Sequence, residues 1–423
     1  MSEKKKSENS PKKSSVDAAT EFIKERAKPK KNAASDIDFS FGCQLIDILV
    51  GGGISMGIPV GKILNIVGDK SSGKTFLSNE LIAAAYHRFG KKFKWVYDDA
   101  ESGYSFDTEY LYGFEIMPMD DDDRIKSRNV QQFYVNVRKF AESLKKDEFG
   151  VYVIDSLDGL TSKEATARAD KLYAVELGKA KEGKTGSYQM ESAKFLSQTF
   201  FKEITSSLED KNILLIIISQ TRDKIDSMFK EQTRAGGKAL DFYAHTVLWL
   251  SNLAKIKEKG IPIGVVAKAQ NKKSKTPRPY RECKFTVLFD HGVDDIGTSV
   301  DYLFGCLGLD NQHKKGDLVW EEGEKESVAN IKAFFEEQGW EEDFSNSDYG
   351  NKKDDRIDYA LDDPDRKKAY ESHFGIPYSR DELIQMIEED ETGKMKKELN
   401  RRVLEKWEEI EEQARPKRKK KYQ

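Results

Sequence analysis

Short apolar runs alternate with longer segments of helical periodicity through most of the chain. The runs are rich in Val, Ile, Leu and aromatic residues and are short enough for buried strands; they cover residues 61–67, 93–97, 151–154, 213–218, 246–250, 263–267 and 284–289. Apolar residues recur every three or four positions between Met190 and Leu208, which predicts a helix. Strands that alternate with helices indicate an α/β fold with a doubly wound, mostly parallel sheet.

The two ends of the chain lack this alternation. The N-terminal stretch is rich in Lys, Ser and Asn, has few apolar residues apart from a patch around Phe22, and predicts a flexible basic arm with one short helix. Near the C-terminus, helical patterns at 381–390 and 395–413 predict a small α-rich domain, followed by a basic, disordered tail. We therefore expect four regions, which are 1–35, 36–310, 311–412 and 413–423.

Composition narrows the classes of protein that fit. A chain of 423 residues with 38% hydrophobic residues is long enough for about two or three domains. The 71 Lys and Arg against 74 Asp and Glu leave a net charge of −3, so any nucleic-acid surface must come from segregated charge. The cysteines and histidines show no disulfide or metal-ligand spacing. No apolar run approaches the ~18 residues of a membrane span, and no signal peptide pattern follows Met1, so we expect a cytoplasmic protein without membrane contact.

One glycine-rich segment follows the first long apolar run and opens a helical pattern. It consists, in chain order, of Gly68, Asp69, Lys70, Ser71, Ser72, Gly73, Lys74 and Thr75. Glycines let consecutive backbone N–H groups wrap around phosphates, and the N-terminus of the helix adds partial positive charge. In such a loop the lysine meets the β- and γ-phosphate oxygens, and the hydroxyl that follows it binds Mg²⁺. The segment predicts a nucleoside triphosphate site in which Lys74 and Thr75 hold phosphate and metal.

Three further apolar runs lead into polar residues suited to ATP hydrolysis. The run at 151–154 delivers Asp155, the expected second Mg²⁺ residue. The run at 93–97 leads to several acids, among which Glu101 is our candidate for activating the attacking water, with Asp98 and Asp99 in support. The run at 213–218 leads to Gln220, whose amide can contact a γ-phosphate or the water as both donor and acceptor. The expected catalytic residues are Lys74, Glu101 and Gln220.

These elements, in this order, resemble the RecA family of DNA strand-exchange ATPases over residues 40–300. The most specific part begins at Gln220 and ends in the pair Gly236-Gly237, and it looks like the family's second DNA-binding loop. The resemblance implies a RecA-like P-loop NTPase core in which Gln220 senses the γ-phosphate and orders this loop. The residues expected to contact DNA are Arg222, Lys224, Ile225, Met228, Phe229, Arg234, Gly236, Gly237 and Lys238.

The composition of this loop suits single-stranded DNA. Cations follow the phosphates, and flat or apolar groups meet the bases. Met228 and Phe229 are apolar residues in a stretch that is otherwise polar, although they could instead pack on the core. The pair Gly236-Gly237 would let a phosphate approach backbone N–H groups, or it could make only a turn before the next helix.

The resemblance also assigns residues around the nucleotide. Asp107 and Tyr110 correspond to an acid and an aromatic residue that hold the adenine, and residues 162–188 correspond to the first DNA loop. Within the family the nucleotide lies between subunits, and two lysines of a Lys-Asn-Lys motif reach in from the neighbour. Lys272 matches the second of these lysines, whereas Gln270 stands in place of the first.

Two other features of the resemblance concern assembly and origin. Lys268 or Lys273 could replace the missing lysine, and the N-terminal arm is expected to pack on the adjacent subunit of a helical homo-oligomer. The C-terminal region, with an acidic helical segment after the turn at Phe374-Gly375-Ile376, is closer to phage UvsX-type recombinases than to ordinary bacterial members. A phage-encoded member acting in a bacterial cell or an infected host is therefore expected.

The resemblance implies an ATP-dependent DNA recombinase for homologous recombination and repair. It would use ATP and Mg²⁺, form a filament on single-stranded DNA, pair that strand with homologous double-stranded DNA and exchange strands, with single-strand-binding and mediator proteins as further partners. Three alternatives remain open at this point. They are a hexameric helicase motor on the same fold, a regulatory recombinase paralogue that acts as an adaptor, and an ATPase unrelated to nucleic acid.

Overall fold

The fold is described from a computed structural model of the chain. The structure describes residues 38–53, 55–118, 120–177, 189–223, 232–234, 237–276, 278–304 and 380–418. The N-terminal arm expected at 1–35 lies outside these residues. The same is true of most of the region expected at 311–412.

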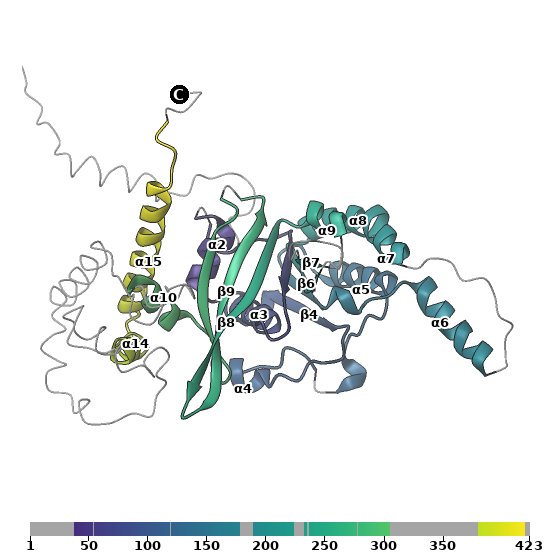
Figure 1. Ribbon diagram of the computed structural model, residues 1–423, viewed down its shortest axis with the longest axis horizontal. Helices are drawn as coiled ribbons and strands as arrows, with labels where there is room; N and C mark the ends of the chain where they lie inside the picture. Colours follow the sequence, from purple (N-terminus) through teal and green to yellow (C-terminus); the bar gives the residue numbers. More distant parts are fainter. Residues whose placement is uncertain are drawn as a thin grey trace, which may run out of the picture. The chain divides into compact units, whose positions relative to one another are not determined.

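A nine-stranded sheet forms the centre of the fold (Figure 1). Its main path has the order β11-β10-β9-β8-β3-β6-β5-β4, and β7 pairs with β6. The parallel strands are β3 (Ile63–Gly68), β4 (Phe93–Asp99), β5 (Phe149–Asp155), β6 (Ile213–Asp223) and β8 (Thr246–Glu258). The antiparallel strands are β7 (Gln232–Arg234), β9 (Ile261–Ser274), β10 (Glu282–Leu288) and β11 (Gly292–Asp294). A separate pair is formed by β1 (Asp38–Phe39) and β2 (Ile58–Pro59).

Helices cover both faces of this sheet. The longer helices of the described residues are α2 (Gln44–Gly51), α3 (Lys74–Phe89), α5 (Val130–Ser143), α6 (Lys163–Glu176), α8 (Phe201–Asp210), α10 (Asp295–Phe304), α14 (Arg380–Glu389) and α15 (Lys394–Gln413). Of these, α6 contributes no residue to either hydrophobic cluster. The shorter ones are α4 (Thr108–Tyr112), α7 (Gln189–Phe195), α9 (Gly237–Tyr243), η1 (Gly90–Lys92), η2 (Asp121–Asp123), η3 (Leu157–Gly159) and the π-helical η4 (Leu196–Phe200).

Alternate residues of the central strands bury into opposite hydrophobic clusters. In β3, Leu64 and Ile66 join the cluster that contains α2, α3 and α15, whereas Ile63 and Val67 join the cluster that contains α5 and α8. A strand buried on both faces has no polar side, and this is why its sequence is a continuous apolar run. The sequence-based prediction of a doubly wound, mostly parallel sheet is confirmed.

The apolar runs locate the strands but understate the length of some. Strands β8 and β9 continue well past the predicted 246–250 and 263–267, as a long antiparallel hairpin. The added residues include Lys255 and Lys257, which are exposed, so this part of the hairpin has the mixed sequence of a half-solvated sheet. The helix predicted from Met190 to Leu208 is present as α7, η4 and α8 in succession.

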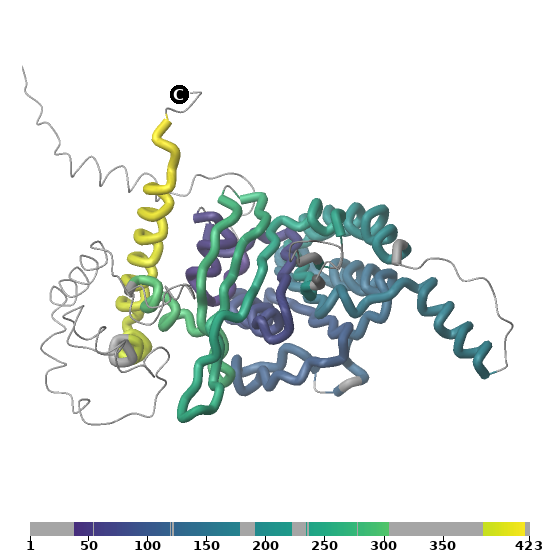
Figure 2. The backbone as a smooth tube through the Cα atoms, viewed as in Figure 1, coloured from purple at the N-terminus to yellow at the C-terminus, as the bar shows by residue number. Residues whose placement is uncertain are grey.

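The two C-terminal helices lie where helical periodicity predicts them, and they pack on the sheet domain. Met395, Leu399, Val403 and Trp407 repeat every four residues along α15 and are all buried in the same cluster as α2 and α3. Figure 2 shows α15, in yellow, beside the purple α2, although the two are far apart in the sequence. The boundary expected near residue 310 lies outside the described residues, so the division into 36–310 and 311–412 stays a prediction.

Polar contacts reinforce the packing of α15. Gln44 Nε2 donates a hydrogen bond to the Asn400 carbonyl at 2.5 Å, and Lys406 Nζ donates to the Leu303 carbonyl at 2.9 Å near the end of α10. Glu411, buried on α15, receives a bidentate ion pair from the guanidinium of Arg281. These bonds satisfy polar groups that the packing of α15 would otherwise bury without a hydrogen-bond partner.

Among the residues that the structure describes, no helix has the combination of length and apolarity that crossing a membrane requires.

Because Trp407 is buried in the main hydrophobic cluster, Trp407→Ala should destabilise the protein by about 3–5 kcal/mol. Ile410 lies on the same helix with 49% of its side chain exposed, so Ile410→Ala should change stability by no more than about 0.5 kcal/mol. Urea unfolding followed by circular dichroism measures both. Equal, small shifts in the two variants would contradict the packing of α15 described above.

Candidate nucleotide and DNA site

The phosphate loop connects β3 to α3 in a conformation that depends on glycine. A Cβ on Gly68 would lie 2.4 Å from the hydroxyl oxygen of Ser72 and 2.7 Å from the Leu250 carbonyl oxygen, so no side chain fits there. Gly73, immediately before α3, has a φ of 87°, in the left-handed region that favours glycine. The residues predicted as the loop therefore have the backbone geometry that such a loop needs.

Lys74 lies at the centre of the site. Its ammonium donates hydrogen bonds to the carbonyls of Gly68 and Asp69 at 3.0 and 2.7 Å. Burial lowers the pKa of Lys74, and the nearby carboxylates of Asp155 and Glu101 act in the opposite direction. The lysine is thus a cation placed between the phosphate loop and the acids of the neighbouring strands.

The residues predicted for Mg²⁺ contact each other. Thr75 Oγ1 donates to Asp155 Oδ2 at 2.8 Å, and the hydroxyl of Tyr97 donates to the same oxygen at 2.7 Å. Burial raises the pKa of Asp155, while the two hydroxyl bonds lower it and so favour the charged carboxylate. One hydroxyl and one carboxylate suit Mg²⁺, which usually takes its other ligands from water and phosphate. Among the described residues, no group of three or more His, Cys, Asp or Glu side chains is placed to hold a metal ion.

Glu101 lies on the turn after β4, and its neighbours orient it. Asp99 accepts hydrogen bonds from the backbone N–H groups of Gly103 and Tyr104 at 3.2 and 3.1 Å, which holds this turn in place. The Oε1 atom of Glu101 accepts bonds from the Ser156 hydroxyl and from Gln220 Nε2, the latter at 2.8 Å. The structure therefore brings together the acid and the amide that the sequence assigned to water and γ-phosphate.

Asp98 has different surroundings from those expected. It is completely buried, and its carboxylate accepts bonds from the Ser127 backbone N–H at 2.7 Å and the Tyr152 hydroxyl at 2.6 Å. Successive residues of a strand point to opposite faces, so Asp98 and Asp99 diverge. The hydrogen bonds of Asp98 therefore fix Ser127 and Tyr152 to β4, on the face of the strand opposite to Asp99.

Three contacts at this edge involve residues that the sequence reasoning did not assign to the site. Besides the Tyr97 hydroxyl, Asp158 Oδ2 accepts a bond from the backbone N–H of Gln220 at 2.8 Å, and the Thr221 hydroxyl donates to Asp69 of the phosphate loop. Asp158 comes shortly after the end of β5, just as Gln220 comes shortly after the apolar run of β6. Polar residues at this position follow the carboxyl end of a parallel strand, and this is the signal that could have identified Asp158.

The segment expected to form the second DNA loop is described only at its two ends. Strand β7 pairs with the end of β6, with Thr221 opposite Arg234. The side chain of Arg234 is 7% exposed and forms an ion pair with Asp241 of α9, so a DNA contact by Arg234 would require this pair to open. Gly237 has a φ of 55°, and Lys238 is exposed at the start of α9. The remaining predicted contacts lie outside the described residues or have undescribed side chains; they are Arg222, Lys224, Ile225, Met228, Phe229 and Gly236.

The residues expected at the adenine are placed beside each other. Asp107 caps α4, where its side chain accepts the Tyr110 backbone N–H at 3.0 Å. The Tyr110 ring is 70% exposed, as a residue that stacks on a ligand can be. The first DNA loop, expected at 162–188, begins with α6, a helix in which no residue is buried.

The lysines expected to act on a neighbouring subunit differ in their contacts. The ammonium of Lys272 lies 3.5 Å from the centre of the Trp249 ring, in a cation–π contact. Lys273 Nζ donates to backbone carbonyls at the end of α9, including that of Ala244 at 2.8 Å, so it is committed within its own subunit. Lys268 lies on the same face of β9 as Lys272 and pairs with Glu282 at 3.4 Å.

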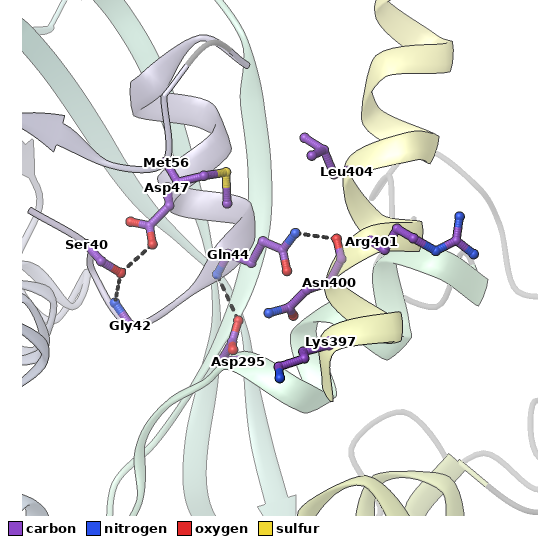
Figure 3. A pocket seen from close by; sticks show the side chains of 10 residues that line it. All are labelled: Ser40, Gly42, Gln44, Asp47, Met56, Asp295, Lys397, Asn400, Arg401 and Leu404. Atoms are coloured by element: carbon purple, nitrogen blue, oxygen red, sulfur yellow. Dashed lines mark hydrogen bonds between the residues drawn. The ribbon is translucent and has the colours of Figure 1, made fainter. Parts of the chain in front are cut away.

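A separate pocket of about 380 Å³ lies between α2 and α15 (Figure 3). None of its lining residues belongs to the phosphate site; they are Ser40, Gly42, Gln44, Asp47, Met56, Asp295, Lys397, Asn400, Arg401 and Leu404. Asp47 is buried there and accepts bonds from the Ser40 hydroxyl at 2.5 Å and the Phe41 backbone N–H at 2.7 Å. Burial raises the pKa of Asp47 to about 7 despite these bonds.

The fold and this site define a RecA-like P-loop nucleotide-binding protein. Comparison with known families agrees, because the model of the RecA N-terminal domain matches residues 26–294, more than half of the chain. The chain belongs to this family. Members of the family are ATPases of recombination and repair that use Mg²⁺, bind DNA and form oligomers.

One solved structure, titled as the RadB recombinase, is similar to the chain at a TM-score of 0.40 and 16% sequence identity. The alignment covers 61% of this chain and 99% of the RadB chain.

Loss of the Tyr97 hydroxyl should weaken Mg²⁺ binding. Tyr97→Phe removes one of the bonds that favour the charged form of Asp155, and such supporting bonds are worth roughly 10- to 100-fold in metal affinity. We expect the Mg²⁺ concentration for half-maximal ATP hydrolysis to rise about tenfold. Tyr104→Phe is the control, since that hydroxyl bonds Asn79 at 3.2 Å and not Asp155. An unchanged Mg²⁺ requirement in Tyr97→Phe would contradict the role of the hydroxyl.

Asp47 should make stability depend on pH. Its pKa is raised to about 7 in the folded protein, so the protonated carboxyl favours the folded state. This contribution to the free energy of unfolding is fully present below about pH 4 and is lost as pH rises to about 7. It amounts to about 4 kcal/mol in all. Asp47→Asn keeps an acceptor for the Phe41 N–H and removes the buried charge. The melting temperature of Asp47→Asn relative to the unsubstituted protein should therefore be higher at pH 8 than at pH 5.

The exposed Asp290 provides the control. The melting temperature of Asp290→Asn relative to the unsubstituted protein should be the same at pH 8 and at pH 5. A melting-temperature difference for Asp47→Asn that is the same at both pH values would show that Asp47 does not titrate in this range.

Proposed function

We propose that the chain is an ATP-dependent DNA recombinase that forms filaments on single-stranded DNA and catalyses homologous pairing and strand exchange. Its partners would be single- and double-stranded DNA, further copies of the same chain, and single-strand-binding and mediator proteins. Membership of the RecA family supports the general class, and the contacts of Gln220 favour the specific activity.

The site residues divide the work of hydrolysis. Lys74 neutralises the β- and γ-phosphate oxygens, and the loop N–H groups hold them in place. Thr75 and Asp155 would hold Mg²⁺, which supplies charge neutralisation of the phosphates when bound. Glu101 takes the proton of the attacking water. Asp99 holds the turn that carries Glu101 in place through its bonds to two backbone N–H groups.

The observation that carries the proposal is the position of Gln220. Its side-chain amide contacts Glu101 at 2.8 Å, and the next residue of its main chain begins the β6–β7 pairing that frames the second DNA loop. A contact between Gln220 and a γ-phosphate would compete with the contact to Glu101. The same residue can therefore report the state of the nucleotide to the loop, which couples ATP to DNA affinity.

Several expectations from the resemblance extend this proposal. The adenine contacts of Asp107 and Tyr110, the contact of Lys272 with a neighbouring subunit, the DNA contacts of the second loop, the division into four regions and a phage-encoded origin are all part of it. For the second lysine of the intersubunit pair, the engagement of Lys273 with α9 favours Lys268.

Measurement of ATP hydrolysis with and without single-stranded DNA tests the proposal. The unsubstituted protein should hydrolyse ATP several-fold faster with DNA, and Lys74→Ala should reduce turnover by about 100-fold or more, because an electrostatic contact to the reacting phosphates is removed. Lys91→Ala is the control. Its side chain is exposed in η1, beyond the end of α3 that lies away from the phosphate loop, so turnover should change by less than about threefold.

The outcomes separate the alternatives. Hydrolysis that is indifferent to DNA would argue against the recombinase and leave an ATPase unrelated to nucleic acid. DNA unwinding without homologous pairing would favour a helicase motor. Full biological activity of Lys74→Ala would favour an adaptor that needs no turnover.

A further inference from the structure

Strand β6 extends beyond the end of its neighbour β5 at the edge of the sheet that carries the phosphate loop. The last residue pair between the two strands joins Ile154 to Ile217, and β5 ends one residue later. On its other side β6 stays paired for longer, since Gln220 lies opposite Gly68 of β3. Among the described strands, the main chain at Gln220 therefore has a partner on one side only. An N–H group that faces the open side needs another acceptor.

Asp158 supplies this acceptor with its side chain. Its Oδ2 atom accepts the Gln220 N–H at 2.8 Å, where a longer β5 would have placed a backbone carbonyl. Hydrogen bonds to a charged acceptor are stronger than those between neutral groups, so this bond is suited to fix one point of the main chain. The fixed point lies immediately before the segment expected to form the second DNA loop.

The turn that carries Asp158 is itself fixed. This turn is η3, which follows β5 after a single residue. Leu157 is 4% exposed and packs in the cluster that contains α5 and α8. The Gly159 N–H donates to the Ser156 carbonyl at 3.1 Å, which closes the turn. The carboxylate of Asp158 is therefore carried by a backbone that packing and hydrogen bonding hold in one place.

The chain around this turn also contacts Glu101. The Ser156 hydroxyl donates to Glu101 Oε1, and the Glu101 N–H donates to the Asp155 carbonyl at 3.3 Å. A Cβ on Gly159 would lie 3.4 Å from Glu101 Cγ, so the two segments are in close contact. The turn therefore touches both partners of the 2.8 Å contact between Gln220 Nε2 and Glu101 Oε1.

We propose that Asp158 is a positioning residue for Gln220, whose main chain it holds so that the side-chain amide stays within reach of Glu101 and of a γ-phosphate. A small misplacement of such a group is enough to remove much of its effect on a reaction. Asp158 acts through Gln220 and not by contact with the nucleotide. The inference rests on the proposed function, in which the Gln220 amide exchanges its contact to Glu101 for one to the γ-phosphate.

Hydrogen–deuterium exchange of the full chain without nucleotide tests the bond itself. Overlapping peptides that differ only by Gln220 isolate its amide. In Asp158→Ala this amide should exchange about tenfold faster or more, the usual effect of losing a bond to a charged acceptor. In Asp158→Asn the side-chain oxygen still accepts the N–H, so exchange should stay within about threefold of the unsubstituted protein. Asp210→Ala is the control, because it removes an exposed carboxylate before the opposite end of β6.

ATP hydrolysis with saturating single-stranded DNA tests the role of the bond. Asp158→Ala should lower kcat about tenfold and leave KM for ATP within about twofold, because the phosphate loop is untouched and only the placement of the amide changes. Asp158→Asn should restore kcat to within about threefold of the unsubstituted protein. Asp210→Ala should leave both constants unchanged.

Several results would overturn the proposal. Unchanged exchange of the Gln220 amide in Asp158→Ala would show that the bond does not hold the main chain. Faster exchange without loss of kcat, or a lower melting temperature with a raised KM in both variants, would make the role of Asp158 structural only.

The charge of Asp158 is separated from its role as an acceptor by Asp158→Asn. Burial lowers the pKa of Lys74, and Asp158 is among the carboxylates that oppose this effect. Asp158→Asn with normal exchange but the low kcat of Asp158→Ala would assign the effect to this charge, and the positioning role would fail.

The proposed function can fail separately. If hydrolysis by the unsubstituted protein is indifferent to DNA, the recombinase is overturned, and kcat without DNA then tests Asp158. A lower kcat at constant KM in Asp158→Ala, with faster exchange of the Gln220 amide, would still support the positioning role. An unchanged kcat in that protein would overturn both.

Discussion

The common direction of the central strands is the constraint on which the rest of the structure depends. Because β3, β4, β5 and β6 run parallel, their carboxyl ends meet at one edge of the sheet, and each delivers a different chemical group there. The groups are the glycine-rich loop, the acid proposed to activate water, the acid proposed to bind Mg²⁺, and an amide. Reversal of any one of these strands would carry its group to the opposite edge of the sheet. The burial of both sheet faces makes this arrangement rigid, since each central strand is fixed by packing on two sides.

The positions of these groups could be predicted from the sequence because each follows a continuous apolar run. The runs identify the strands, and the first polar residues after them identify the edge, which is how Asp155, Glu101 and Gln220 were found. The supporting contacts are harder to foresee. Tyr97 is an aromatic residue inside a strand, where core packing is the ordinary interpretation, and only its neighbour across the sheet shows that its hydroxyl reaches Asp155.

Long-range pairings account for the other differences between expectation and structure. Lys273 and Lys268 look equivalent in the sequence, but Lys273 bonds to carbonyls at the end of α9, whereas Lys268 pairs with Glu282. The ion pair between the buried Arg234 and the exposed Asp241, and the packing of Trp407 on the sheet domain, depend in the same way on partners that local sequence does not reveal. The periodicity of α15 predicted a helix and its apolar face, and the fold determined what that face covers.

The bonds from Lys273 to the carbonyls of α9 fix one end of the segment that follows the second DNA loop. Ala244 is tied to β9, and the adjacent His245 N–H donates to the Ile63 carbonyl at 2.8 Å, so this end is anchored to the sheet. At its other end the segment starts from Gln220, whose side-chain amide donates to Glu101 at 2.8 Å. The two described ends of this segment therefore differ: one is hydrogen-bonded to the sheet, and the other carries the side-chain contact between Gln220 and Glu101.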